Sequence, residues 1–178
     1  MPRAFLPRVR AACALALPLF VAACAVPQRA VSPAASRTAA QTAADSAAVA
    51  RVLDAFHGAA ARADVDGYFG QMTPDGVFIG TDAEERWTRA QFSAYVQPYF
   101  ARGQGWTYTP TRRHVAVTPD GQSAYFDERL DNEAYGVCRG TGVLVRTAAG
   151  WKIAQYHLTI PVPNALARDV VRMIRGQR

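Results

Sequence analysis

The strongest candidates for chemistry are one acid, two arginines and one histidine in the second half of the chain. Glu128, Arg112, Arg139 and His157 each fall in a segment where apolar and polar residues alternate, which is typical of a strand. Pairing these strands across their short turns predicts one row on one sheet face, in the order Arg112, Glu128, Arg139, His157. A carboxylate between two guanidinium groups, next to an imidazole, would bind a ligand or serve as an acid–base pair.

The same row also has a structural interpretation. An Arg–Glu–Arg ion-pair network would close one end of the sheet, and His157 would then satisfy a buried hydrogen bond. The neighbouring layers contain Phe126, Val143 and Ile153, and an apolar floor beside polar groups is what a ligand pocket needs. His114, expected opposite Phe126, is a further ligand-binding candidate. The row depends on register, because a slip of one residue moves a strand's side chains to the other face.

Other candidate side chains carry weaker signals. Tyr68, Trp87 and Tyr108 would line the pocket or simply pack in the core. His57 lies near the apolar stripe of the first expected helix, which favours a histidine at the core boundary. Cys138 alternates away from Arg139 and is expected to be a buried, unreactive thiol. No HExxH motif, paired cysteines or glycine-rich phosphate loop is present, so we expect no metal site and no cofactor.

The elements that must position these residues follow from periodicity and capping signals. Helices are expected from Asp45 or Ser46 to Ala63, from Asp64 onward, and from a capping box at Thr88. The expected strands are 77–79, 106–117, 123–130, 137–145 and 151–159, followed by a final helix that Asn164 would cap. Helices grouped against one antiparallel sheet predict an α+β fold.

Several short motifs carry a resemblance to a known family. They are Phe78-Ile79-Gly80-Thr81-Asp82-Ala83, Glu85-Arg86-Trp87, Gly105-Trp106-Thr107-Tyr108, Phe126-Asp127-Glu128, Arg139-Gly140-Thr141-Gly142-Val143-Leu144 and Trp151-Lys152-Ile153-Ala154-Gln155-Tyr156-His157-Leu158. Together they resemble the SnoaL-like branch of the nuclear transport factor 2-like superfamily over residues 45–164. The resemblance implies a cone-shaped fold, in which a curved antiparallel sheet is wrapped by three N-terminal helices plus a C-terminal helix. It also implies one deep pocket and, often, a homodimer formed through the sheet.

The resemblance leaves the function open. The superfamily contains isomerases, dehydratases, polyketide cyclases, an epoxide hydrolase and many proteins without enzymatic activity. Ketosteroid isomerases combine a carboxylate base with a tyrosine and a protonated aspartate, and no such trio matches this sequence residue by residue. The epoxide hydrolase uses an Asp–Arg–Asp arrangement, whereas Glu128 is a single acid expected between two arginines.

The N-terminal residues predict export and a lipid anchor. Arg3, Arg8 and Arg10 precede an apolar stretch that is too short to span a bilayer and ends in Val21-Ala22-Ala23-Cys24. This resembles a bacterial lipobox, with an ordinary cleaved signal peptide as the alternative. The predicted organisation is a lipoprotein signal peptide (1–23), a lipidated Cys24 with a flexible Ala/Ser/Thr/Pro tether (24–44), the SnoaL-like domain (45–164) and a C-terminal helix (165–178). An alanine-rich helix is the alternative for the tether. The expected location is the bacterial cell envelope, anchored to a membrane.

Net charge and cysteine content limit the classes of binding partner that we expect. Removal of three leader arginines lowers the formal charge from +6 to +3 (17 basic minus 14 acidic residues), too little to indicate nucleic-acid binding. Cys138 would then be the one free thiol. We therefore expect a membrane-anchored domain that binds a small apolar or acidic molecule or a protein partner in its pocket. The alternative is a cofactor-independent isomerase, dehydratase or cyclase that uses Glu128 and His157 as acid and base.

Overall fold

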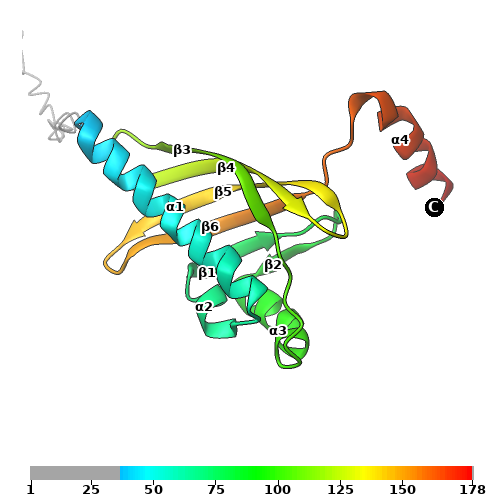
Figure 1. Cartoon of the computed structure of the whole chain (residues 1–178), viewed down its shortest axis with the longest axis horizontal. Helices are drawn as coiled ribbons and strands as arrows, with labels where there is room; N and C mark the ends of the chain where they lie inside the picture. Colours follow the sequence, from blue (N-terminus) through cyan, green and yellow to red (C-terminus); the bar gives the residue numbers. More distant parts are fainter. Residues whose placement is uncertain (1–36, 178) are drawn as a thin grey trace, which may run out of the picture. The chain divides into compact units, whose positions relative to one another are not determined.

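A curved six-stranded sheet with helices along one face forms the body of the protein (Figure 1). The computed structural model describes residues 37–177. The strands lie in the order β2-β1-β6-β5-β4-β3, and all neighbours are antiparallel except β1 and β6, which run parallel. Their bounds are β1 (Met72–Ile79), β2 (Arg86–Thr88), β3 (Thr109–Val117), β4 (Ser123–Asn132), β5 (Gly136–Thr147) and β6 (Gly150–Thr159). The predicted α+β class is confirmed.

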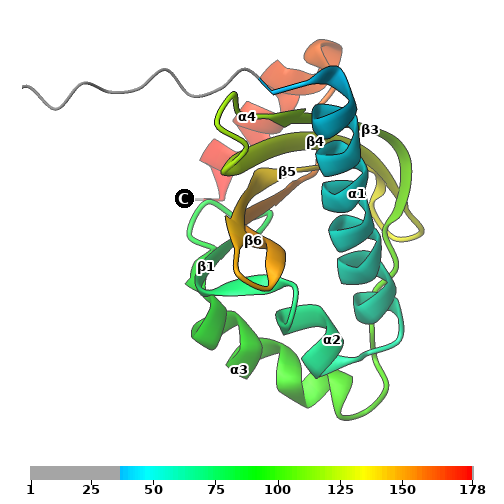
Figure 2. The same ribbon diagram turned by 90° about the vertical axis from the view of Figure 1, so that its left-hand side faces the viewer.

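The long helix α1 (Ala39–Ala61) lies along the inner face of the sheet (Figure 2). Its apolar stripe buries Val49, Leu53, Phe56 and Ala60 against the strands, as the 3.6-residue period indicates. The helix begins at Ala39 because Thr38 forms a capping box with Gln41. Residues 39–44, which we expected to belong to a flexible tether, are therefore helical. Cys24, the leader and the rest of the expected tether lie outside the described residues.

Two shorter helices cover the remaining end of the inner face. In α2 (Val65–Phe69), the Asp64 carboxylate accepts a hydrogen bond from the backbone N–H of Gly67 at 2.8 Å. The capping box predicted at Thr88 is present at the start of α3 (Arg89–Phe100), and Phe92 is among the residues that α3 buries. A single 3-10 turn, η1 (Asn164–Leu166), precedes α4 (Ala167–Gly176). Leu166 rather than Asn164 occupies the cap position of α4 and makes no side-chain cap bond, so the expected Asn164 cap is wrong.

The hydrophobic core lies between the sheet and helices α1–α3. Within residues 37–177, all of its buried apolar residues fall between Val49 and Leu158, so α4 contributes none of them. Cys138 is buried, and burial raises the pKa of its thiol, which agrees with the expected unreactive cysteine. Within residues 37–177, no helix is long and apolar enough to cross a membrane.

The register of all three hairpins between β3 and β6 differs from the prediction. In β5–β6, Val145 lies opposite Lys152 rather than the expected Trp151, and an irregularity between Val143 and Leu144 shifts the pairing once more. Val117 lies opposite Ala124 rather than the expected Ser123. The backbone N–H of Thr118 donates to the carbonyl of Ser123 at 2.8 Å, so the loop between these two residues has four residues. Leu130 lies opposite Cys138 rather than Val137, because β4 and β5 continue to a short turn. The Asn132 side chain closes that turn by accepting from the backbone N–H groups of Ala134 and Tyr135, and Gly136 follows at φ 67°.

Candidate functional site

A buried carboxylate with three side-chain donors lies at the centre of the inner face. Glu128 is 1% exposed, and its Oε1 accepts hydrogen bonds from His57 Nε2 at 2.7 Å and from the Tyr156 hydroxyl at 3.0 Å. Its Oε2 accepts from Arg113 Nε at 2.8 Å. Arg113 also bonds Asp54 Oδ1 at 2.7 Å, which joins α1 to the sheet a second time. These five side chains are called the Glu128 network below.

Strand pairing explains how the network assembles. Arg113 lies directly opposite Glu128 on β3, so the two side chains share the inner face. Tyr156 comes from β6, which is separated from β4 by β5. Its hydroxyl crosses that strand because Gly140 has no side chain: a Cβ there would lie 2.3 Å from the Tyr156 hydroxyl and 2.9 Å from Glu128 Oε1. His57 follows Phe56 on α1 and therefore reaches the sheet beside the core.

The surroundings keep Glu128 ionised. Burial raises the pKa of its carboxyl, but the hydrogen bond from His57 and the charges of His57 and Arg113 outweigh burial, so the pKa lies below its ordinary value. A carboxylate only accepts hydrogen bonds, so Nε2 of His57 carries the proton that it donates. Nδ1 is the ring nitrogen of His57 that Glu128 does not contact. Burial and the nearby Glu128 charge raise the pKa of Tyr156 well above its usual range, so this phenol stays neutral.

The row predicted from the sequence is not formed. Arg112 and Arg139 lie exposed on the outer face of the sheet, and neither is opposite Glu128. His157 also lies on the outer face, opposite Thr141. The β3–β4 and β4–β5 pairings are each shifted by one residue from the prediction. Glu128 therefore lies on the face of the sheet opposite to Arg112, Arg139 and His157. His114 is exposed opposite Asp127, also on the outer face.

Sequence patterns identify only Glu128 in this network, and the other four members, Asp54 among them, were missed. Arg113 was passed over for its neighbour Arg112, and Tyr156 was placed on the face opposite Glu128. His57 was interpreted as a histidine at the core boundary, although it is only 9% exposed. Its position four residues after Leu53 on the apolar stripe was an available signal, because a buried imidazole needs a polar partner.

An aromatic cleft leads toward this network from the α3 side. It has a volume of about 260 Å³ and opens between β1, β2, α3 and the segment before β3. Behind it lies a recess of about 10 Å³, the space of a single water molecule, on which His57 and Tyr156 border. The cleft and the recess share four lining residues, Phe78, Trp106, Tyr108 and Leu158. Thr81, Glu85, Trp87 and Tyr135 are among the other residues around the cleft.

A series of near-parallel aromatic rings forms part of the cleft wall. Trp87, Phe92, Phe78 and Tyr156 follow one another with ring centroids 5.1, 3.9 and 5.8 Å apart and interplanar angles of 23°, 12° and 10°. This series runs from the cleft to the Glu128 network. Burial raises the pKa of Tyr108 to about 12, so its hydroxyl on the shared wall is a neutral donor. Tyr68 is buried and lines the recess, Trp87 lines the cleft, and Tyr108 lines both.

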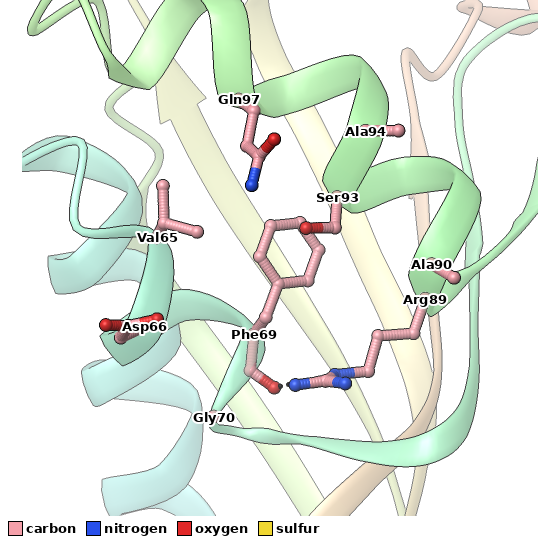
Figure 3. Close-up of a pocket in the computed structure, with 9 residues that line it drawn as sticks. All are labelled: Val65, Asp66, Phe69, Gly70, Arg89, Ala90, Ser93, Ala94 and Gln97. Atoms are coloured by element: carbon pink, nitrogen blue, oxygen red, sulfur yellow. Dashed lines mark hydrogen bonds between the residues drawn. The ribbon is translucent and has the colours of Figure 1, made fainter.

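A separate surface groove lies between α2 and α3 (Figure 3). It has a volume of about 460 Å³, and Phe69, Ser93 and Gln97 point into it. Arg89 closes one end, where its Nε donates to the carbonyl of Phe69 at 3.1 Å. The groove contains no member of the Glu128 network, and its lining is mostly small or apolar.

Comparisons with known proteins agree with this architecture. The profile of the SnoaL-like domain family matches residues 49–163. The chain belongs to the SnoaL-like domain family. No curated protein matches the sequence, but solved structures do. One is an uncharacterised protein with a cystatin-like fold from Caulobacter vibrioides, with 18% identity over 72% of this chain and 99% of that one and a TM-score of 0.59.

Two further solved structures are described as enzymes. A candidate dehydratase of the NTF2-like family from Streptomyces avermitilis is 18% identical over 68% of this chain and 99% of that one, with a TM-score of 0.58. A candidate aromatic ring hydroxylase from Novosphingobium aromaticivorans is 20% identical over 68% of this chain and 92% of that one, with a TM-score of 0.57. At these identities the likeness shows the fold alone and does not determine the activity. The expected SnoaL-like branch is confirmed by the family profile.

The chemistry available at the site is acid–base chemistry. No group of three or more histidine, cysteine or acidic side chains suited to a metal ion occurs within residues 37–177. Nε2 of His57 is held by a buried carboxylate and the ring borders on the recess, a position from which an imidazole can serve as a general acid or base. Glu128 itself lines neither the cleft nor the recess, but its partners His57 and Tyr156 both line the recess.

Proposed function

We propose that the aromatic cleft binds a small, planar, largely apolar molecule and that the His57–Glu128 pair moves a proton on it. The reaction would be a cofactor-independent isomerisation or dehydration. The observation that carries this proposal is the position of His57, which borders on the recess while Nε2 is held 2.7 Å from a buried carboxylate. His57 takes the acid–base role that the sequence suggested for His157, and Glu128 becomes its positioning residue.

The shape of the site limits the ligand. A planar ring can stack against the series of near-parallel aromatic side chains that the cleft exposes, where offset stacking is favourable. The recess admits one heavy atom, so the reacting group is small: a hydroxyl, a carbonyl oxygen or a single carbon. The neutral Tyr108 hydroxyl on the shared wall is available to donate to an oxygen atom of the ligand. Nδ1 of His57 would accept a proton from the adjacent carbon, and the protonated imidazole would return it to the rearranged molecule.

Proton exchange on a planar bicyclic ketone tests this proposal. Incubation with 2-tetralone in D₂O would break a C–H bond next to the carbonyl, form the enolate and return a deuteron, which mass spectrometry detects. We expect the wild-type protein to accelerate exchange and the His57→Gln variant to lose at least 10-fold of that acceleration, since general acid–base catalysis contributes about 10²–10⁴-fold. Equal exchange in both proteins would contradict the assignment of His57. The His157→Gln variant is the matched control and is expected to match the wild type.

A binding role without turnover is the second candidate, favoured by the small size of the recess. Quenching of tryptophan fluorescence reports ligand entry, because Trp87 and Trp106 line the cleft. Saturable quenching by 2-tetralone without any exchange would support the binding role. Absence of both quenching and exchange would remove both candidates for this class of ligand.

We also propose that the domain is held at the bacterial envelope by lipid on Cys24, as the lipobox suggests. Incorporation of radioactive palmitate that is lost in Cys24→Ser is the expected result. Unchanged incorporation in that variant would contradict the anchor.

A further inference from the structure

Helix α4 has an unpartnered apolar face. Ala167, Val170, Val171 and Ile174 follow one another at the spacing of one helical face, and Met173 adjoins it. None of the residues of α4 is buried, and Met173 and Ile174 are 60% and 51% exposed. An apolar face of this kind gains free energy when something covers it.

The opposite face of α4 is basic. Arg168, Arg172 and Arg175 follow the spacing i, i+4, i+7 and therefore share one side of the helix. Asp169 is the one acid of α4, and it is paired with Arg172. The helix is thus divided into an apolar side and a side with net positive charge, the pattern of helices that lie in the surface of a membrane.

The length and attachment of α4 fit such a surface position. Its 10 residues extend about 15 Å, half the thickness of the hydrocarbon core, so it would lie in the plane of the surface rather than cross it. It follows β6 through Ile160, Pro161, Val162 and Pro163, which form no helix or strand. Two prolines make this connection a semi-rigid spacer of roughly 12 Å.

The charge of the sheet argues against a second copy of the chain as the occupant. The outer face of the sheet is the other large exposed surface. It carries Arg112, Arg129 and Arg139 on three adjacent strands beside the acids Asp127 and Asp131, so the net charge of these five residues is positive. These positive charges would repel the arginines of α4. An anionic surface instead attracts both arginine groups.

We propose that α4 binds the surface of an anionic lipid bilayer, with Val170, Val171, Met173 and Ile174 in the headgroup region and the three arginines against lipid phosphates. This contact is independent of the aromatic cleft and of any lipid on Cys24. It would hold the domain close to the membrane through the C-terminal helix.

Vesicle binding by residues 34–178 tests the proposal, since this segment keeps every core residue and lacks the apolar leader. Co-sedimentation with phosphatidylcholine vesicles containing 30% phosphatidylglycerol is compared with pure phosphatidylcholine. We expect clear binding to the anionic vesicles only. Replacing Arg168, Arg172 and Arg175 by glutamine is expected to weaken binding about 100-fold, because each basic residue near an anionic surface contributes about fivefold. Ile174→Asp is expected to weaken it at least 10-fold.

The matched control removes the same number of arginines from the sheet. The triple variant Arg112→Gln, Arg129→Gln, Arg139→Gln should bind anionic vesicles within about 3-fold of the unmodified segment, because α4 is intact. Equal binding of both triple variants would overturn the proposal. Light scattering identifies the competing occupant: a dimer that Ile174→Asp converts to a monomer, without vesicle binding in either form, would assign the apolar face to a second copy.

Discussion

The two faces of the sheet both carry acidic and basic side chains, which are buried on the inner face and exposed to water on the outer face. On the inner face, Glu128 and Arg113 are removed from water and joined by hydrogen bonds to His57. On the outer face, their immediate neighbours Asp127 and Arg112 remain exposed. A buried charge must be paired because its desolvation is costly, whereas an exposed charge is stabilised by water whether or not it has a partner. Adjacent residues on one strand therefore have different energetic roles.

The largest expected contrast is between Glu128 and Asp127. Glu128→Ala leaves Arg113 and His57 without their buried acceptor and is expected to lower the free energy of unfolding by about 3–5 kcal/mol. Asp127→Ala changes an exposed position and is expected to change it by about 0.5 kcal/mol or less. Urea denaturation followed by circular dichroism measures both. Similar losses in the two variants would show that the Glu128 network is not what distinguishes the faces.

A smaller effect is expected when the network is crowded rather than broken. In Gly140→Ala the new Cβ would lie 2.3 Å from the Tyr156 hydroxyl, so the phenol must move and its bond to Glu128 must lengthen. Overpacking of this kind costs about 1–3 kcal/mol, again measured by urea denaturation. Gly176→Ala, which meets no neighbouring atom in exposed α4, is the control and should be neutral or slightly stabilising. A neutral Gly140→Ala would mean that the Tyr156 bond contributes little.

The smallest effect concerns the protonation of Glu128. Its pKa in the folded state lies below the ordinary value of 4.5, so the unfolded chain takes up the proton at a higher pH. The stability contributed by the carboxylate is therefore fully present above about pH 5 and is lost as the pH falls through the folded pKa. Denaturation from pH 3 to pH 7 should show a wild-type advantage over Glu128→Gln that shrinks below about pH 4.5. Thr141→Ala, a nonionisable change on the outer face, should run parallel to the wild type; a pH-independent difference for Glu128→Gln would contradict the lowered pKa.

The fold was predictable because its signals are local. The capping box at Thr88, the cap at Asp64 and the apolar stripe containing Leu53 act within one or two turns, and the structure follows them. The site was predictable only in part. Glu128 was identified as the central acid, but its partners depend on whether a hairpin loop has an even or an odd number of residues, and one residue changes the face. The contact with His57 depends on how α1 packs on the sheet, which no local pattern specifies.

The parallel pairing of β1 with β6 has a consequence for folding kinetics. Met72 pairs with Ile153 and Ile79 with His157, and His57 meets Glu128 across 71 positions of sequence. Such non-local contacts require the closure of long loops before they contribute free energy, which slows folding relative to helical proteins of the same size. During synthesis, α1 and β1 emerge well before β6, and until then the apolar side chains of β1 and an unpaired strand edge remain open to other chains. We expect the Glu128–His57 bond to form late, so the step that completes the candidate site is also the step that ends the period of greatest aggregation risk.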